Sequence, residues 1–579
     1  MTIPIGKSRK EISLVLCGAA GQGVQTVEEL LIRAIRHIGY SVFASREYMS
    51  RVRGGNNSTE IRISPWPIRA FVDRIDIAVP LSLGVRDNIL RRISKETIVI
   101  CDQEDLGSEI EKFRGSILNV NINEVAREIG GKVFSNFIAA GVILGLIGGG
   151  MESAKAFCDE KFSGKKEKLA EQNKVALERG YVIGRSYIGD DSILLPPDQA
   201  IRSAQRVVMS GTEAVSLGAL SAGCSFVTAY PMSPATGVLT FMAQKAKEME
   251  IIVEQAEDEI AAINMAIGAS YSGARSMVTT SGGGFDLMCE GVSLAGVMET
   301  PVVIHLAQRP GPATGMATRT EQGDLNVALY GGHGEFPRAV LAPASLEEAF
   351  RLSSKAFYLA DTYQIPVILM TDQYFLNTYY DMAMPDVKGT LVPPAIVEAN
   401  DNYRRYEITH DGISPRAVPG YGNGLVGADS HEHDEIGHVY EDFDLRERMV
   451  QKRLRKIESM QKDIEEPLLI GPEDFRTLII GWGSSFHIIE ETLEFIGRSD
   501  TALMHFQQIY PLPQNIGMKL EQAQKIIVIE GNKTGQFARL LTQHTGRMID
   551  YVLPYYSGLQ FSVEQLTRDL DSCLNGEVL

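Results

Sequence analysis

Short apolar segments that end in small residues and lead into helix-like segments restrict the fold of this chain more than any other feature of its sequence. The predicted strands in the middle of the chain are residues 226–229, 251–254, 276–280, 302–307 and 367–371. Helix-like segments lie between them. Strands that alternate with helices predict a parallel sheet with helices on both faces.

The same pattern occurs near both ends of the chain. Residues 12–17 form an apolar run that leads into Gly18-Ala-Ala-Gly21-Gln-Gly23 and then a helix over about residues 25–38. Near the other end, Thr477-Leu-Ile-Ile-Gly-Trp leads into a glycine turn, and residues 525–530 form a further apolar run. With 579 residues, the chain is too long for one core. We therefore predict a multidomain α/β protein with three doubly wound parallel-sheet units.

Changes in composition suggest the domain boundaries. Residues 1–190 form the first α/β domain, which ends in a lysine-rich surface helix and linker, and residues 196–390 form the second. Residues 391–470 form an extended linker that ends in a charged helix, and the alternating charges of this helix predict that it is exposed. Residues 471–579 form the third α/β unit.

Composition also disfavours several classes of function. The formal net charge of −17 disfavours binding to nucleic acid. The six cysteines are scattered and form no CxxC pair, so no zinc or iron–sulfur motif is expected in this chain. His431, His433 and His438 are interpreted as polar loop residues, because no cysteine accompanies them. The apolar run over residues 137–150 is too short to span a bilayer, and no export signal is convincing, so we expect a cytoplasmic protein without a membrane partner.

Two polar segments are candidate sites. Residues 228–319 place acidic residues on and beside a predicted apolar helix; these are Glu254, Glu257, Asp258 and Glu259. A buried carboxylate needs a partner, since burying an unpaired charge is costly. In the first domain, the glycine loop reverses the spacing of the dinucleotide fingerprint and supports only a helix N-terminus that can take a phosphate or carboxylate. Arg46, Arg51 and Arg53 follow in a predicted polar loop, which could hold an anionic ligand or form an interface.

Several of these segments together resemble one known family. Tyr230-Pro-Met-Ser-Pro234, Gln255-Ala-Glu-Asp-Glu259, Thr279-Thr-Ser-Gly-Gly-Gly and Thr318-Arg-Thr-Glu-Gln-Gly-Asp324 are similar to the α subunit of 2-oxoacid:ferredoxin oxidoreductases. The N-terminal domain resembles the γ domain of these enzymes, here fused ahead of α. Glu530-Gly-Asn-Lys-Thr-Gly-Gln536 resembles the family's transketolase C-terminal-like domain. The resemblance covers nearly the whole chain.

The resemblance implies an enzyme of the 2-oxoglutarate synthase type. The implied reaction is CoA-dependent oxidative decarboxylation of a 2-oxoacid, with thiamine diphosphate as cofactor and ferredoxin as electron acceptor. We expect 2-oxoglutarate as substrate, and pyruvate, branched-chain and aryl oxoacids remain alternatives. A non-redox thiamine-dependent transferase and a scaffold subunit are also open. This chain has neither a suitably spaced GDG motif nor a cysteine cluster. Mg²⁺, the diphosphate pocket and a [4Fe–4S] cluster are therefore expected on a β subunit, in an (αβ)₂ assembly.

The resemblance also implies roles for individual residues. The implied cofactor contacts are Glu259, Pro231, Ser281 and Gly282. The implied substrate contacts are Tyr230, Ser233, Arg309 and Arg319. Glu259 matches the glutamate that bonds the aminopyrimidine, although a structural salt bridge remains an alternative for it, and Glu257 is the second choice. Arg309 matches the arginine for the 1-carboxylate, and Arg319 favours an oxoacid with a distal carboxylate. Arg46, Arg51 and Arg53 are candidates for CoA or interface contacts.

Overall fold

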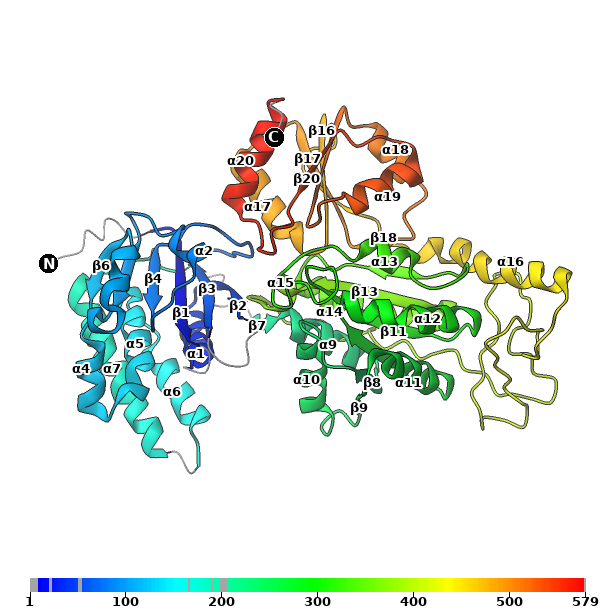
Figure 1. Ribbon diagram of the computed structural model, residues 1–579, viewed down its shortest axis with the longest axis horizontal. Helices are drawn as coiled ribbons and strands as arrows, with labels where there is room; N and C mark the ends of the chain where they lie inside the picture. The colour runs from blue at the N-terminus through cyan, green and yellow to red at the C-terminus, as the bar shows by residue number, and fades with distance from the viewer. Residues whose placement is uncertain are drawn as a thin grey trace. The chain divides into compact units, whose positions relative to one another are not determined.

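The computed structural model describes residues 9–19, 23–49, 55–164, 167–189, 191–197 and 206–576. The chain divides into two compact units, Met1–Met209 with Asn377–Met384, and Ser210–Leu376 with Pro385–Leu579. Three β-sheets, each with helices against it, make up these units (Figure 1). The prediction of an α/β fold with three sheet units is confirmed.

The first unit holds an eight-stranded mixed sheet in the order β6-β5-β4-β1-β3-β2-β14-β7. The strands are β1 (Ile12–Ala19), β2 (Ser41–Glu47), β3 (Asn56–Ser64), β4 (Ile77–Pro80), β5 (Ile98–Cys101), β6 (Ser116–Asn119), β7 (Arg206–Ser210) and β14 (Thr378–Ala383). Strands β1, β4, β5 and β6 are parallel, whereas β3 is antiparallel to both β1 and β2. The connection from β2 to β3 is too short for the crossover that parallel strands require, which is why this part of the sheet departs from the predicted parallel arrangement.

Seven helices are described in the first unit: α1 (Val24–His37), α2 (Asp87–Leu90), α3 (Gln103–Leu106), α4 (Ile122–Ile129), α5 (Ser135–Ile147), α6 (Met151–Lys161) and α7 (Glu167–Ile188). Helix α5 contains most of the apolar run noted in the sequence, up to Ile147, and it is almost wholly buried. Glycines let α7 lie directly against it, since an added Cβ at Gly141 would be 2.9 Å from the Tyr181 backbone nitrogen. Of the described helices, none is by itself both long and apolar enough to cross a membrane; Ile122–Ile129 with Lys132–Ile147 pass that test only as a pair bent by 117°.

Strand β14 joins the first sheet from far along the sequence. It pairs antiparallel with β2, although the prediction placed these residues in the second domain. Its Asp381 is buried, and its carboxylate accepts hydrogen bonds from Ser41 Oγ at 2.6 Å and from the Val42 backbone nitrogen at 3.0 Å. The same carboxylate pairs with Arg206 Nε of β7 at 2.7 Å. The first unit is therefore completed by a segment that lies between two parts of the second.

The second unit contains a seven-stranded sheet in the order β18-β12-β13-β11-β10-β8-β9. Its strands are β8 (Phe226–Ala229), β9 (Ile252–Gln255), β10 (Ser276–Thr280), β11 (Val302–Gln308), β12 (Ala339–Leu341), β13 (Pro366–Asp372) and β18 (Gln508–Tyr510). The helices around it are α9 (Gly211–Ser221), α10 (Thr236–Lys245), α11 (Glu259–Tyr271), α12 (Gly282–Val297), α13 (Leu325–Tyr330), α14 (Leu346–Tyr363) and α15 (Gln373–Leu376). All five strands predicted in the middle of the chain are present within one residue of their expected bounds. All pairings in this sheet are parallel except that of β18 with β12.

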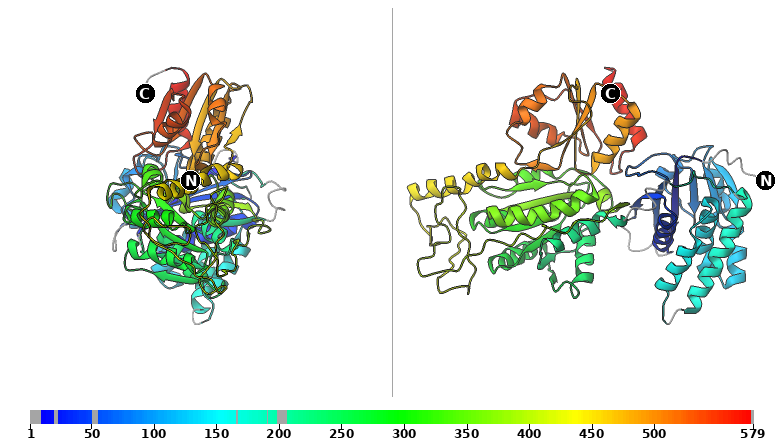
Figure 2. Two further views of the ribbon diagram at one scale, coloured as in Figure 1. Left: turned by 90° about the vertical axis from the view of Figure 1, so that its right-hand side faces the viewer. Right: turned by 180° about the vertical axis from the view of Figure 1, so that it is seen from behind.

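The C-terminal part of the second unit forms a five-stranded sheet in the order β15-β17-β16-β19-β20. Its strands are β15 (Leu468–Ile470), β16 (Thr477–Trp482), β17 (Thr501–Phe506), β19 (Lys525–Glu530) and β20 (Tyr551–Pro554). Helices α17 (Phe486–Ile496) and α20 (Val563–Leu574) lie on one side, and α18 (Ile516–Glu521) and α19 (Gln536–Thr545) on the other (Figures 1 and 2). Buried residues of both sheets of this unit, such as Ile304 and Ile480, belong to one hydrophobic core.

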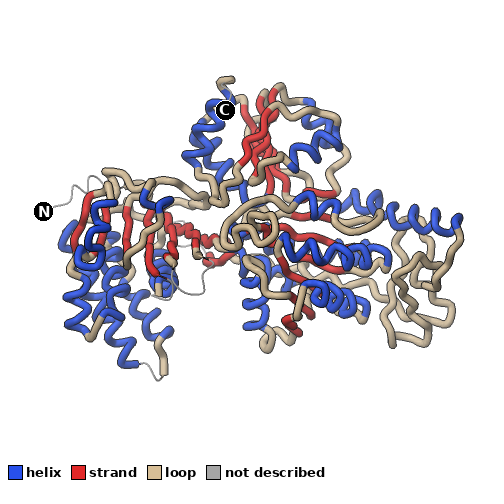
Figure 3. Tube along the Cα trace, viewed as in Figure 1, coloured by secondary structure: helices blue, strands red, loops and turns tan. Residues whose placement is uncertain are grey.

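Along the chain between β14 and β15, residues 385–442 run mostly as loops and lead into α16 (Phe443–Ser459) (Figure 3). The prediction that this charged helix is exposed is wrong for Lys452 and Lys456, which are fully buried. Their Nζ atoms lie 2.6 Å and 2.5 Å from the two carboxylate oxygens of Glu299. His433 is also buried, with its ring centre 3.9 Å from that of Tyr406.

Candidate functional site

The site begins where β9 turns into α11. Asp258 caps this helix, because its carboxylate accepts a hydrogen bond from the Ala261 backbone nitrogen at 2.7 Å. Glu259 is the first helical residue and is only 3% exposed, whereas Glu257 and Asp258 are exposed. Glu254 lies in strand β9, beside the helix, in agreement with the predicted strand over residues 251–254. Of the four acidic residues, Glu259 alone is buried, and it is the one that the family resemblance implies as the cofactor contact.

Glu259 lies against the start of α12. An added Cβ at Gly284 would be 2.9 Å from both Cγ and Oε1 of Glu259, so only glycine leaves the carboxylate this much room. Within the described part of the chain, Glu259 Oε1 and Ser281 Oγ, at the start of α12, are buried without a hydrogen-bond partner. The structure gives Glu259 no salt bridge among those residues, so the structural alternative has no support. Buried polar atoms normally have hydrogen-bond partners, so these two atoms indicate a binding site for polar groups of a ligand.

Arg309 follows β11 at the carboxyl end of the same sheet. Its Nη1 donates a hydrogen bond to the Ser233 backbone oxygen at 2.7 Å, which brings two predicted substrate contacts together. Its Nε is buried and has no partner among the described residues. Burial lowers the pKa of Arg309, and the carboxylates of Asp324 and Glu259 counteract part of this shift. Arg309 therefore keeps donor capacity for an anion beside Glu259.

The turn from residue 230 to residue 235 connects β8 to α10 at the same end of the sheet. Tyr230 is 41% exposed, while Pro231 and Ser233 are partly buried. Open α/β sheets bind ligands at the carboxyl ends of their strands. The turn therefore lies where a substrate contact is expected, and the roles of its individual residues stay predictions.

Asp324 is a carboxylate at this site that the sequence analysis did not assign. An added Cβ at Gly282 would be 2.5 Å from Asp324 Cγ and Oδ2, so the carboxylate lies directly against the start of α12. Oδ2 is buried without a partner among the described residues, and the Asp324 backbone nitrogen donates to Gln308 Oε1 at 3.2 Å. Burial, reinforced by Asp286 and Glu321, raises the pKa of Asp324 to about 7. Its position at the end of the Thr318–Asp324 segment was the signal that could have found it.

Arg319 lies in the same loop as Asp324 and is partly buried. Its Cβ and Cγ pack beside Gly558, at 3.3 Å and 3.6 Å from the position of an added Cβ there. Its backbone nitrogen donates to the Met316 oxygen at 3.0 Å. The loop thus carries both a predicted substrate arginine and the unassigned Asp324.

The predicted arginine cluster of the first unit is only partly described. Arg46 lies in strand β2 and not in a loop, because β2 stays paired with β3 as far as Glu47. Its Nε donates to both carboxylate oxygens of buried Glu28 at 2.7 Å, and its guanidinium lies over the Tyr379 ring. Arg51 and Arg53, like residues 20–22 of the glycine loop, lie outside the described residues. Arg46 therefore has a structural role, and a CoA contact for it stays a prediction.

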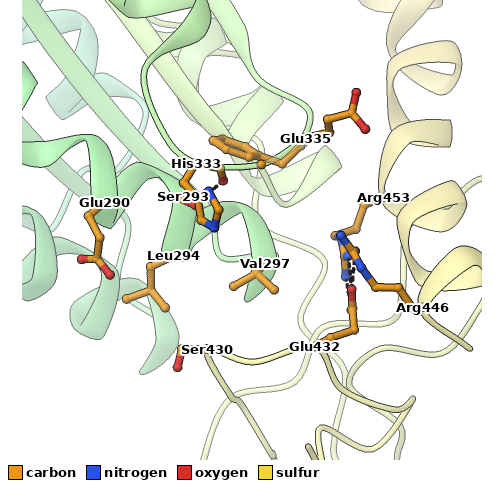
Figure 4. Close-up of a pocket in the computed structure, with 12 residues that line it drawn as sticks. Glu290, Ser293, Leu294, Val297, His333, Glu335, Ser430, Glu432, Arg446 and Arg453 are labelled. Atoms are coloured by element: carbon orange, nitrogen blue, oxygen red, sulfur yellow. Dashed lines mark hydrogen bonds and ion pairs between the residues drawn. The ribbon is translucent and has the colours of Figure 1, made fainter. Parts of the chain in front are cut away.

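A separate cavity of about 340 Å³ lies between α12, the loop after α13 and the linker with α16 (Figure 4). Arg446 and Arg453 both point at Glu432 (Figure 4). The two guanidinium nitrogens Nη1 and Nη2 of Arg453 donate to the two carboxylate oxygens of Glu432 at 2.9 Å and 2.8 Å. Glu290 points away from this pair. The cavity contains none of the predicted site residues, so the candidate site is the region around Glu259 and Arg309.

Comparison with known proteins points to one enzyme family. Residues 217–452 match the family described as "Pyruvate flavodoxin/ferredoxin oxidoreductase, thiamine diP-bdg", and residues 13–183 match "Pyruvate ferredoxin/flavodoxin oxidoreductase". The 2-oxoacid:ferredoxin oxidoreductase subunit alpha of a Sulfolobus species is 31% identical and is aligned over 96% of each chain. The 2-oxoglutarate oxidoreductase subunit KorA of Mycobacterium tuberculosis is 27% identical over 98% of this chain and 92% of that one.

A solved structure has a similar fold over almost the entire length. It is the 2-oxoglutarate:ferredoxin oxidoreductase from Magnetococcus marinus, with 2-oxoglutarate, coenzyme A and succinyl-CoA bound. The TM-score is 0.91 at 26% identity, and the match covers 98% of this chain and 100% of that one. The N-terminal, central and C-terminal sheets therefore all have counterparts in one solved chain.

Proposed function

Because the chain belongs to the α-subunit family of the 2-oxoacid:ferredoxin oxidoreductases, we propose that its substrate is 2-oxoglutarate. In the proposed reaction the oxoacid loses CO₂, the remaining acyl group forms a thioester with CoA, and two electrons pass to ferredoxin. The names of two relatives support this choice, since the M. tuberculosis subunit is a 2-oxoglutarate oxidoreductase and the M. marinus structure holds 2-oxoglutarate and succinyl-CoA.

The observation that carries the proposal is the buried carboxylate oxygen of Glu259, which has no partner among the described residues; Ser281 Oγ, at the start of α12, is buried without one as well. Thiamine diphosphate, when bound, supplies the carbon nucleophile and electron sink that decarboxylation of a 2-oxoacid needs. The residues fit its aminopyrimidine, since they offer buried polar atoms without partners among the described residues, and the glycines at 282 and 284 let Asp324 and Glu259 lie directly against the start of α12. Glu259 would bond the pyrimidine nitrogen N1′ and so hold a proton there. Pro231, Ser281 and Gly282 would line the same ring.

Substrate binding would depend on the residues around Arg309. Its unpartnered Nε is available for a charge-assisted hydrogen bond to the 1-carboxylate of the oxoacid. Ser233, with its backbone oxygen on Arg309 Nη1, would place its hydroxyl near the same group, and Tyr230 would flank it. Arg319 would bind the distal carboxylate, which pyruvate lacks.

A β subunit would complete this site. We propose that it supplies Mg²⁺, the diphosphate pocket and the [4Fe–4S] cluster that reduces ferredoxin, in an (αβ)₂ assembly in the cytoplasm. Two apolar side chains on the helices that carry this site are exposed: Ile260, next to Glu259 on α11, is 49% exposed, and Leu287 on α12 is 51% exposed. Their exposure supports a partner on these helices.

The test is oxoacid-dependent viologen reduction by this chain co-purified with its native partner, with and without CoA, on 2-oxoglutarate and pyruvate. Glu259→Gln removes the carboxylate charge and is expected to lower the rate by about 100-fold or more. Glu257→Gln is the matched control, because Glu257 is exposed two residues away, and it should keep full activity. Bound thiamine is measured in every preparation.

The outcomes separate the parts of the proposal. CoA-dependent reduction that collapses only in Glu259→Gln would support it. Full activity of Glu259→Gln would overturn the role of this carboxylate. Faster turnover of pyruvate than of 2-oxoglutarate would overturn the choice of substrate, and a thiamine-loaded complex without iron would favour a non-redox transferase.

A further inference from the structure

The loop that carries Arg319 and Asp324 is held by the C-terminal region of the chain, residues 471–579. Gln322 is the centre of this attachment and is 4% exposed. Its backbone nitrogen donates to the Gly531 oxygen at 2.7 Å, and its Oε1 accepts from the Gly531 nitrogen at 2.8 Å. Its Nε2 donates to the Trp482 oxygen at 3.0 Å, and its backbone oxygen accepts from Asn532 Nδ2 at 3.1 Å. Every hydrogen-bonding group of Gln322 is therefore matched by the C-terminal region.

Neighbouring residues of the loop are attached in the same way. Gln536 Nε2 donates to the Gly323 oxygen at 2.8 Å, and Gln536 Oε1 accepts from the Asn326 nitrogen at 2.8 Å. The Thr320 nitrogen donates to the Gly558 oxygen at 3.1 Å. Contacts from Gly531, Gln536 and Gly558 thus reach the chain between Arg319 and Asp324 and just after Asp324 in the sequence.

The partners of Gln322 are themselves fixed. Glu530 is fully buried at the end of β19, and its carboxylate accepts from Asn532 Nδ2 at 2.7 Å and from the Phe537 nitrogen at 3.0 Å. An added Cβ at Gly531 would be 3.0 Å from Gln322 Cγ, so the two segments are in close contact. Buried and fully satisfied polar networks of this kind specify one geometry.

We propose that Gln322 is a positioning residue that fixes Arg319 and Asp324 relative to Glu259 and Arg309 through the C-terminal region. This inference rests on the proposed function. Glu259 and Arg309 are placed by α11 and β11 and do not depend on Gln322, whereas the loop does. Displacement of a binding group by about 1 Å can lower catalytic efficiency by about 100-fold. The loss should be larger for an oxoacid that uses Arg319 than for one that does not.

The test compares Gln322→Met with Gln508→Met in the complex with the native partner. Both changes replace a buried glutamine by an apolar side chain of similar length. Gln508 donates to the Pro511 oxygen at 3.2 Å and accepts from the Glu465 nitrogen at 3.1 Å, so it belongs to the same unit but not to the loop. We measure KM and kcat for 2-oxoglutarate and pyruvate, bound thiamine, and hydrogen exchange over residues 316–326.

We expect Gln322→Met to raise the KM for 2-oxoglutarate by about 10- to 100-fold with less effect on pyruvate, unchanged bound thiamine and faster exchange in the loop. Gln508→Met should leave both KM values unchanged. The inference is overturned if the two variants have the same KM values, or if Gln322→Met affects both oxoacids equally. If Gln322→Met does not assemble, Gln536→Met releases only Gly323 and Asn326 and is held to the same criteria. A wild-type complex that reduces no viologen with any oxoacid would overturn the proposed function instead.

Discussion

The buried cluster of Glu299, Lys452 and Lys456 allows one stability prediction to be developed in detail. The three side chains are at most 1% exposed, and each lysine binds a different carboxylate oxygen. Arg405 adds a hydrogen bond from Nη2 to the Glu299 backbone oxygen at 2.6 Å. Glu299→Gln keeps the size of the side chain but removes the only negative charge among these three residues. Two lysine ammonium groups would then be buried without their counter-charge.

The size of the effect follows from the burial of the cluster. Removing one partner of a buried ion pair costs about 3–5 kcal/mol. Burial would raise the pKa of Glu299, but Lys456 and Lys452 outweigh it and hold that pKa well below its usual value. Burial lowers the pKa of Lys456 to about 7 although Glu299 attracts the charge. Without Glu299 this pKa should fall further, so the variant's Lys456 becomes neutral at a lower pH.

The sign of the pH dependence is therefore defined. A lysine whose pKa is lower in the folded state binds fewer protons there than in the unfolded chain, so stability rises with pH between the two values. In Glu299→Gln this gain begins at a lower pH than in the wild type. The difference in stability between the two should be larger at about pH 5.5 than at about pH 8.

Local hydrogen exchange over α16 measures the effect without assuming two-state unfolding of a multidomain chain. Glu458→Gln on the exposed face of the same helix is the control and should change stability by less than about 0.5 kcal/mol. Equal exchange in Glu299→Gln and Glu458→Gln would refute the reasoning. A large difference that did not change with pH would refute the account of the lysine charges.

Three further predictions follow from the site and the first sheet. Arg319→Ala removes the charged contact proposed for the distal carboxylate, so the KM for 2-oxoglutarate should rise by about 10- to 100-fold, while the KM for pyruvate should stay nearly unchanged. Equal effects on the two KM values in viologen assays would contradict the distal-carboxylate role. The pKa of Asp324 is raised to about 7 in the folded chain. Between the ordinary pKa of an aspartate and 7, the folded chain therefore keeps a proton on Asp324 that the unfolded chain has lost, so wild-type stability should fall as the pH rises through this range. Asp324→Asn should remove this fall, and parallel melting curves for variant and wild type across that range would contradict it. Asp381→Ala removes the carboxylate that accepts from the buried Ser41 hydroxyl and the Val42 backbone nitrogen and that pairs with Arg206 Nε. It should cost roughly 3–5 kcal/mol, seen as faster hydrogen exchange in β2 with α11 unchanged; exchange that is unchanged in β2 would count against it.

The sequence predicted the regular part of the fold well. Buried parallel strands are apolar runs with small residues at their ends, so β8, β10 and β13 are visible from local composition alone. The signals for these strands are local, and the structure agrees with them. Glu259 was singled out by the resemblance to the family rather than by local composition, and the structure shows that it is the buried one of the four acidic residues.

The features that the sequence did not reveal depend on partners far away in the chain. Lys452 and Lys456 were predicted to be exposed because their counter-charge, Glu299, lies about 150 residues earlier in the chain. Arg46 was predicted to lie in a loop because its contacts with Glu28 and Tyr379 could not be seen in the sequence. Charged side chains are rarely buried unless they are paired, so a sequence alone predicts them to be exposed until an opposite charge that packs against them is known.

Strand β14 also limits the order in which this chain can fold as it is synthesised. Strands β2 and β7 are both neighbours of β14 in the first sheet, yet residues 211–377 separate β7 from β14 along the chain. At translation rates of about 5–20 residues per second, roughly 10–30 seconds pass between the emergence of the two strands. Until then the backbone groups of β2 that face β14 are an open edge, which is a template for pairing with another chain. A nascent chain stopped before residue 378 would keep that edge open, whereas the finished chain closes it with its own strand.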